Sequence, residues 1–188
     1  MKKYVLDLSA IEGTYCYCSP SGAEAARAAV ADLPLEGIHF IGTGDYHYAS
    51  YFFLERISEP FALALFDNHP DDQDGAFGDG LLSCGGWVAW ARRDLPLLHL
   101  DVRNSTDIPA ELPVYLSIDL DVLSTEFART DWDQGDMTLD GLLDMIGLIR
   151  RHHRILGADI CGGLANPATC ILDLNRRAEE AIAAAIIR

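Results

Sequence analysis

The sequence lacks any long run of apolar residues, and this absence argues against one class of protein. No apolar stretch approaches the ~20 residues that a helix needs to cross a bilayer. The start, MKKYVLDLSAIEG, carries two lysines but no long apolar segment and no small-residue cleavage site. We therefore expect a first strand there rather than a signal peptide, and no association with a membrane.

Basic residues are also scarce. The chain has 14 Lys and Arg against 29 Asp and Glu, which gives a net charge of −15. A surface of this charge repels phosphate backbones, so the composition argues against a nucleic-acid partner. The excess of carboxylates suits divalent cations, although charge on its own is a weak indication.

The cysteines are few and odd in number: Cys16, Cys18, Cys84, Cys161 and Cys170. Their spacing is unlike that of a small disulfide-rich domain, so we expect reduced thiols and a cytoplasmic protein. Cys16-Tyr17-Cys18 is one residue too short for the CxxC motif of metal or redox sites. We interpret that pair as two small, partly buried residues near the end of a strand.

The chain is of a size and composition that predict one globular domain, residues 1–188. It has 188 residues, of which 49% are hydrophobic and 23% charged. Short, nearly continuous apolar runs predict strands buried on both faces; they span residues 4–8, 38–41, 61–66, 97–102, 114–118 and 155–160. Helical patterns lie between and after these runs, at residues 21–33, 48–57, 81–93, 138–153 and 174–187. This alternation predicts a three-layer α/β/α fold with a mainly parallel sheet.

Polar residues follow several of these strands at the point where each one ends. In open α/β sheets, ligands bind beyond the carboxyl ends of the strands. GTGDYHY follows the second run, DNHPDD the third, and the fifth leads into Asp119-Leu120-Asp121. The candidate metal ligands at these ends are His47, Asp67, His69, Asp71, Asp119 and Asp121.

These four carboxylates and two imidazoles predict a site for two metal ions. Burying such groups without partners costs several kcal/mol, on the order of 2–7 per group, so cations are the expected compensation. In extended backbone, residues 67, 69 and 71 would share one side, and if the strand loosens at its tip they can still close around one centre. Oxygen and nitrogen ligands without thiolate suit Mn²⁺, Fe²⁺, Co²⁺ or Zn²⁺, and a carboxylate-rich site favours Mn²⁺. Each motif alone is more often a polar loop or a turn, so the prediction depends on their joint occurrence.

The motifs GTGDYHY, DNHPD and SIDLD resemble the GGDH, DxHxD and SxDxD motifs of the arginase/agmatinase (ureohydrolase) family, in the same order. The resemblance spans residues 37–163. It implies a compact arginase-like three-layer fold and a dinuclear Mn²⁺ site. It also implies that Asp67 and Asp119 bridge the two ions.

The same resemblance implies how the remaining ligands divide between the ions. His47 and Asp71 would complete the shell of one ion, and His69 and Asp121 that of the other. Asp71 would also hold the bridging hydroxide by a hydrogen bond. That hydroxide would attack the carbon of a guanidino or amidino C–N bond.

The chain also departs from the family pattern. Tyr46 is an extra residue before His47, and the segment between Asp71 and Asp119 is short, so we expect a strand and a helix to be missing. Cys84, in SCGGW, replaces the family's proton-shuttling histidine. It either relays protons or is a small buried residue, and we favour the second interpretation slightly.

A second departure affects substrate recognition. Arginases have a glutamate shortly after the Asp-Ile pair that matches Asp159-Ile160, and this chain has none. Asp133 either takes over cation recognition or proton transfer, or is a turn residue. Trp132 and Gln134 beside it are expected to line the pocket. Further expectations are that residues flanking the ligands orient the imidazoles, namely Gly44, Asp45, Asp72, Gln73 and Asp74.

Three functions follow, and the sequence leaves all of them open. The first is a metal-dependent hydrolase of non-peptide C–N bonds, with Asp71, Cys84 and Asp133 as candidate catalytic residues. Its substrate would be a small molecule or peptide that carries a guanidino-like group, and a homo-oligomer is left open. The second is a deacetylase-like hydrolase with one metal ion. The third is a catalytically inactive protein that binds metal or a metabolite.

Overall fold

The chain folds around a six-stranded sheet in which every pair of neighbouring strands is parallel. The computed structural model describes residues 1–73, 75 and 80–187. The strands lie in the order β1-β3-β8-β7-β4-β6. Their bounds are β1 Lys2–Val5, β3 Gly37–Phe40, β4 Phe61–Phe66, β6 Leu98–Arg103, β7 Val114–Asp119 and β8 Ile155–Cys161. The predicted parallel sheet is therefore confirmed.

The continuous apolar runs identify the inner strands well and the edge strands less well. Every residue of β4 and β7 is buried, as expected for strands covered on both faces. The first strand was expected at residues 4–8 but ends at Val5, because the Asp7 carboxylate accepts hydrogen bonds from the amide and hydroxyl of Ser9 and turns the chain. Leu6 and Leu8 beyond the strand are buried in the core instead.

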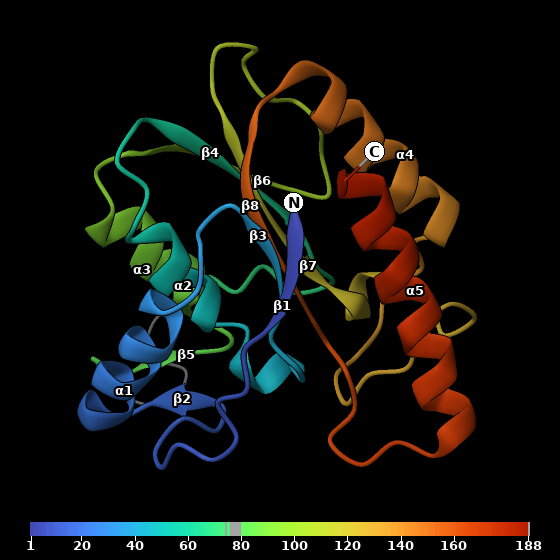
Figure 1. Cartoon of the computed structure of the whole chain (residues 1–188), viewed down its shortest axis with the longest axis horizontal. Helices are drawn as coiled ribbons and strands as arrows, with labels where there is room; N and C mark the ends of the chain where they lie inside the picture. Colours follow the sequence, from blue (N-terminus) through green and yellow to red (C-terminus); the bar gives the residue numbers. More distant parts are fainter. Residues whose placement is uncertain (74, 76–79, 188) are drawn as a thin grey trace.

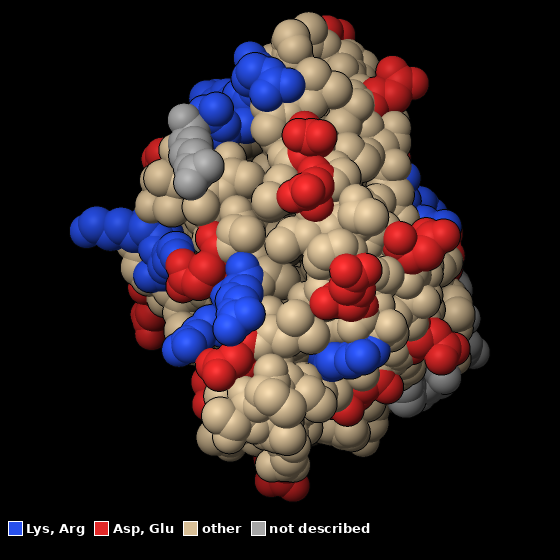
Figure 2. Space-filling model, turned by 90° about the vertical axis from the view of Figure 1, so that its right-hand side faces the viewer, with Lys and Arg blue, Asp and Glu red and all other residues tan. Residues whose placement is uncertain are grey.

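Helices cover both faces of the sheet, as predicted (Figure 1). On one face lie α1 (Pro20–Ala31), α2 (Ala49–Leu54) and α3 (Trp87–Asp94). On the other lie α4 (Leu139–His152) and α5 (Thr169–Ile187), whose outer surface carries charges of both signs (Figure 2). A separate hydrophobic cluster fills the space on each side of the sheet. In the described part of the chain, no helix is long and apolar enough to span a bilayer.

Two of the helix predictions need correction. The helix expected at residues 81–93 begins only at Trp87, because Leu82–Ser83 forms a short strand, β5. This strand pairs antiparallel with β2, Tyr17–Cys18. The last helix begins at Thr169 rather than at residue 174. Strands of two residues leave no periodic pattern, so the sequence could not reveal the β2–β5 pair.

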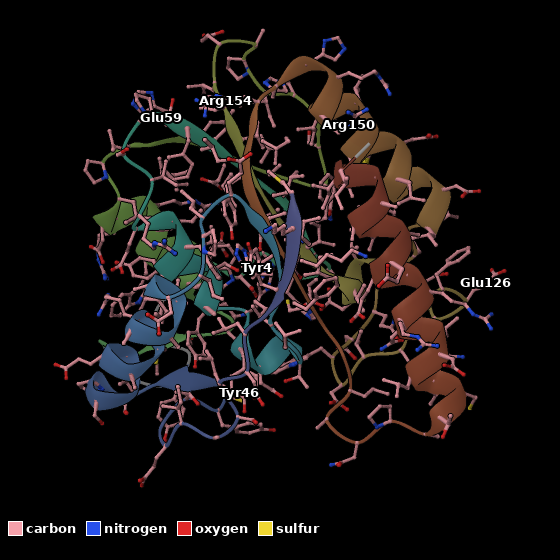
Figure 3. All side chains as sticks on the ribbon, in the orientation of Figure 1. Tyr4, Tyr46, Glu59, Glu126, Arg150 and Arg154 are labelled. Atoms are coloured by element: carbon pink, nitrogen blue, oxygen red, sulfur yellow. The ribbon has the colours of Figure 1, made fainter. Side chains whose placement is uncertain are left out.

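Because all six strands run in the same direction, their carboxyl ends share one edge of the sheet. The 3₁₀ helix η1 (Gly44–Tyr46) follows β3 at this edge, and Tyr46 is labelled there in Figure 3. Arg154 and Glu59, which precede β8 and β4, lie at the opposite edge (Figure 3) and form a 2.5 Å ion pair. The loops with the predicted ligands are thus separated from that ion pair by the length of the sheet.

The cap of α4 allows a direct test of local stability. Thr138 is the N-cap of this helix, and its hydroxyl oxygen accepts a hydrogen bond from the amide of Gly141 at 3.1 Å. We expect Thr138→Ala to lower the free energy of unfolding by about 1 kcal/mol, because one amide at the helix start loses its acceptor. Urea denaturation measures this, and Thr138→Ser should retain most of the stability. Equal losses in both variants would contradict the capping role.

Candidate metal centre

All six predicted ligands line one cavity of about 350 Å³ at the carboxyl edge of the sheet. His47 comes from the end of η1, Asp67 directly follows β4, and Asp119 is the last residue of β7. Asp121 lies in the 3₁₀ helix η2 (Leu120–Val122). The other residues that line the cavity are Gly44, Gln73, Cys84, Gly85, Trp132 and Asp133.

The ligand atoms form two groups that share Asp67. In the first, His47 Nδ1 lies 3.1 Å from Asp67 Oδ2 and 3.0 Å from Asp71 Oδ2. In the second, His69 Nδ1 lies 2.8 Å from Asp121 Oδ2 and 3.7 Å from Asp67 Oδ1. Asp67 therefore turns one oxygen toward each group, which is the position of a bridging carboxylate. The ligand atoms of each group lie within 4.8 Å of one another, close enough to hold an ion.

Asp119 lies beside the first group. Its Oδ2 is 3.7 Å from His47 Nδ1, and its Oδ1 accepts a hydrogen bond from the amide of Asp121. The carboxylate is therefore next to His47 and tied to the segment that carries the ligand Asp121. This placement makes Asp119 a further candidate ligand of the ion beside His47.

The loop that carries Asp67, His69 and Asp71 is not extended as expected. The strand ends at Phe66, Asp67 Oδ1 accepts a hydrogen bond from the amide of His69 at 2.6 Å, and Asp71 has a φ of +48°. A non-glycine residue in this left-handed region is strained, and such strain is concentrated at functional sites. The three side chains converge because the loop turns at the tip of the strand, so the extended geometry is wrong and the loosened one is correct.

Neighbouring segments hold this loop in place. The side chain of Asn104, just after β6, accepts a hydrogen bond from the amide of Asp67 and donates one to its carbonyl. At the other end of the loop, Trp87 Nε1 donates to Asp71 Oδ2 at 2.7 Å, and the amide of Val88 donates to the Asp71 carbonyl. The strained loop is thereby fixed at both ends by helix α3 and the edge strand.

A buried hydrogen-bonded chain orients His47. Ser117 Oγ donates to Asp159 Oδ1 at 2.7 Å and lies 2.8 Å from His47 Nε2. Because the hydroxyl proton goes to Asp159, the serine oxygen accepts from Nε2–H, and the lone pair of Nδ1 faces the carboxylates. Partners of this kind fix the tautomer of a metal-binding histidine.

Two of the residues expected to orient the imidazoles, Asp45 and Asp72, have other partners. Asp45 instead accepts hydrogen bonds from Thr43 Oγ1 and Cys16 Sγ. Asp72 forms an ion pair with Arg92, and Asp74 lies outside the described residues. Ser117, which does orient His47, could have been found from the sequence. Residue 117 precedes residue 119 by two positions in a strand, so both side chains point to the same face.

The four carboxylates are almost fully buried, with 1% to 6% of their surface exposed. Burial raises the pKa of Asp67 well above its usual value, and burial and the charge of Asp121 raise that of Asp119 to about 6. Burial alone would lower the pKa of His47, but the neighbouring Cys161 and the oxygens of Asp67 and Asp71 raise it well above normal. The metal-free site thus favours bound protons, and a cation would supply the missing positive charge. The residues therefore fit divalent metal ions.

The other candidate catalytic residues also lie at the cavity. Burial raises the pKa of Cys84 to about 12, which keeps the thiol neutral and agrees with a small buried residue better than with a proton relay. Asp133 and Trp132 are exposed at the cavity. The Trp132 ring is edge-on to the His69 ring, with 6.2 Å between the two ring centroids. Gln134 was expected to line the pocket, which is wrong, because its side-chain amide donates to carbonyls inside its own loop.

The structure adds two residues that the sequence did not indicate. Cys161 Sγ lies 3.1 Å from Asp119 Oδ2 and belongs to a third group of possible ligands, with His47 and Asp119. Gly162 follows with a φ of +96°, and a Cβ there would lie 2.2 Å from Asp119 Oδ1. The backbone at residue 162 packs so closely against a ligand that no side chain fits.

Comparisons with known proteins give the relatives of this fold. No protein-family model matches the chain. An uncharacterized protein of Thermotoga maritima is 34% identical over an alignment of 151 residues, and the match covers 67% of this chain and 58% of that protein. The chain thus spans less than two thirds of that relative.

Solved structures match over most of the chain. Proclavaminate amidino hydrolase from Streptomyces clavuligerus is 16% identical with a TM-score of 0.63, covering 89% of this chain and 70% of that one. A triple mutant of the Trypanosoma brucei (T. brucei) arginase-like protein, bound with Mn²⁺, is 18% identical with a TM-score of 0.59, covering 95% and 71%. The expected arginase-like α/β fold is confirmed.

Replacing Asp119 tests whether the buried carboxylates need a cation. The pKa of Asp119 is about 6 in the folded chain against 3.8 ordinarily, so the folded chain binds the proton more tightly than the unfolded chain. The stability that this proton provides is fully present below pH 4 and is lost as the pH rises through 6. At pH 7 we expect the metal-free Asp119→Asn variant to be more stable than the wild type, by on the order of 2 kcal/mol. The difference should shrink toward pH 4.

Chemical denaturation with a chelator present measures this difference. Added Mn²⁺ should then stabilise the wild type and leave the variant nearly unchanged. A variant that is less stable at pH 7, or that Mn²⁺ stabilises as strongly as the wild type, would contradict the role given to Asp119.

Ser117→Ala tests the chain that orients His47. We expect a 10- to 100-fold rise in the dissociation constant for Mn²⁺, roughly the usual effect of losing a residue that supports a ligand. Ser50→Ala is the matched control, because Ser50 Oγ lies 3.2 Å from Ser117 Oγ, whereas the contact of Ser50 with His47 is made by its backbone amide, which the substitution keeps. Calorimetric titration gives both constants. An equal loss in both variants would show that general packing, and not orientation of the ring, is responsible.

Proposed function

We propose that the chain is a hydrolase that uses two divalent metal ions, Mn²⁺ foremost, to cleave a C–N bond of a guanidino or amidino compound. One observation carries this proposal. Two groups of ligand atoms from buried carboxylates and imidazoles share Asp67, with Asp119 beside them, in one cavity. Four carboxylates balance the formal charge of two divalent ions, and paired ions of this kind activate water in hydrolases.

Bound ions would lower the pKa of water enough to provide hydroxide near neutral pH. Residues of the chain would accept the proton of this water and recognise the substrate. Asp71, which Trp87 and the strained loop hold in place, presents a carboxylate that can accept a proton at the attacking water. Asp133 and Trp132 offer a negative charge and an aromatic ring where a cationic group would enter.

Two of the similar structures support this assignment. One is named as an amidino hydrolase, which is the bond class proposed here. In the other, the Mn²⁺-bound form carries substitutions that introduce two aspartates and a histidine. Aspartate and histidine are the two residue types that make up the six-residue cluster of this chain.

This chain lacks the glutamate that arginases have after the pair matching Asp159-Ile160, and this limits the choice of substrate. Gly162 lies pressed against Asp119, so the segment after β8 provides no carboxylate for a guanidinium group. Among the described residues that line the cavity, Asp133, on the loop between η2 and α4, is the charged side chain outside the ligand set. We therefore propose a small cationic substrate, or a peptide side chain with a guanidino group, held from the side of that loop. All five cysteines are free, which suits a cytoplasmic protein.

A panel of substrates tests the proposal. Urea or ammonia release is measured with guanidino compounds, amidino compounds, arginine-containing peptides and neutral acetylated amides, each with Mn²⁺ present. Turnover of cationic compounds is the expected result. Turnover of acetylated amides alone, with one ion per chain, would favour the deacetylase-like alternative. Two bound ions without any turnover would favour a binding protein.

His69→Ala tests the second ion. His69 supplies the imidazole of that group, 2.8 Å from Asp121, so we expect the variant to hold one ion and to lose nearly all activity. His99→Ala is the control, because His99 is exposed on β6 away from the cavity. Elemental analysis of the dialysed proteins counts the metal. A His69→Ala protein with two ions and normal activity would overturn the assignment of His69.

A further inference from the structure

A sulfur atom lies among the oxygen and nitrogen ligands of the first ion. Cys161 Sγ is 3.1 Å from Asp119 Oδ2, which in turn is 3.7 Å from His47 Nδ1. All three residues are buried, and their ligand atoms lie within 4.8 Å of one another. Within the described part of the chain, Cys161 alone among the cysteines belongs to such a group.

The sheet itself fixes the position of this thiol. Cys161 is the last residue of β8 and pairs in register with Asp119, the last residue of β7. Directly after it, Gly162 turns the chain with a φ of +96° and packs against the Asp119 carboxylate. The neighbouring Asp159, two residues earlier on the same face of the strand, holds Ser117 and thereby the His47 ring. One strand thus carries both the thiol and the group that orients the imidazole.

We propose that Cys161 is a ligand of the ion held by His47 and Asp119, and that this subsite takes a thiophilic ion such as Co²⁺, Zn²⁺ or Fe²⁺ in preference to Mn²⁺. The inference rests on the metal centre proposed above and specifies one of its two positions. The second position, with Asp67, His69 and Asp121, has oxygen and nitrogen donors only. The two ions would therefore sit in chemically different surroundings.

The chemistry of the group supports this preference. Thiolate ligands favour zinc, iron and cobalt, whereas sites of carboxylates and water suit manganese. Without metal, the Cys161 thiol donates to Asp119. Cys161 as thiolate and Asp119 would together hold a bound ion; the thiol proton would be released to water, and the Asp119 oxygen that now accepts it would be free for the ion.

Substitution with Co²⁺ tests the sulfur ligand without measuring activity. A cobalt–thiolate bond gives an intense sulfur-to-metal charge-transfer band in the near ultraviolet, which oxygen and nitrogen ligands do not give. We expect this band in the wild type and its loss in Cys161→Ser, while the variant still binds Co²⁺. Cys84→Ser and Cys170→Ser are the controls and should keep the band, because Cys84 belongs to no ligand group and Cys170 is exposed.

Competition between ions provides a second measurement. In Cys161→Ser, the preference for Zn²⁺ over Mn²⁺ should fall by about tenfold or more, and circular dichroism should show an unchanged fold. If the wild type binds Co²⁺ without the band, or if Cys161→Ser keeps it, the sulfur ligand is refuted while the two-ion hydrolase stands. If no ion binds to the wild type at all, both proposals fail.

Discussion

The rest of this structure depends on four buried carboxylates at one edge of the parallel sheet. Two imidazoles lie among them. Charges of one sign so close together, and so far from water, oppose folding unless protons or cations neutralise them. The free-energy cost of burying these charges is the reason why the pKa values of Asp67 and Asp119 are raised. Metal ions would remove it, so binding of metal and stability of the fold are expected to be coupled.

The scaffold holds this arrangement with groups that lie outside the ligand set. Trp87 and Asn104 fix the two ends of a strained loop, and Ser117 and Asp159 hold a histidine ring. These groups come from strands and helices of both halves of the chain. The geometry of the site therefore depends on the complete sheet, although the six ligands predicted from the sequence follow only three of its strands.

The sequence predicted the inner sheet and the ligands for a simple physical reason. Buried parallel strands are continuous apolar runs, and a polar residue that follows such a run must lie at the sheet edge. The β2–β5 pair and the left-handed turn at Asp71 were not predictable in this way. They depend on contacts between segments that lie far apart in the sequence. Cys161 was expected only to be a reduced thiol. It lies beside Asp119 because of the register between β7 and β8, which the sequence does not reveal.

A crystal structure of the chain grown with Mn²⁺, with anomalous diffraction collected at the manganese absorption edge, would show whether these side chains hold two ions. The account predicts two anomalous peaks in the cavity that Asp67 and Asp119 bridge, one next to His47 and the other next to His69. An empty cavity, a single peak, or a His47 ring turned away from Asp67 would contradict it.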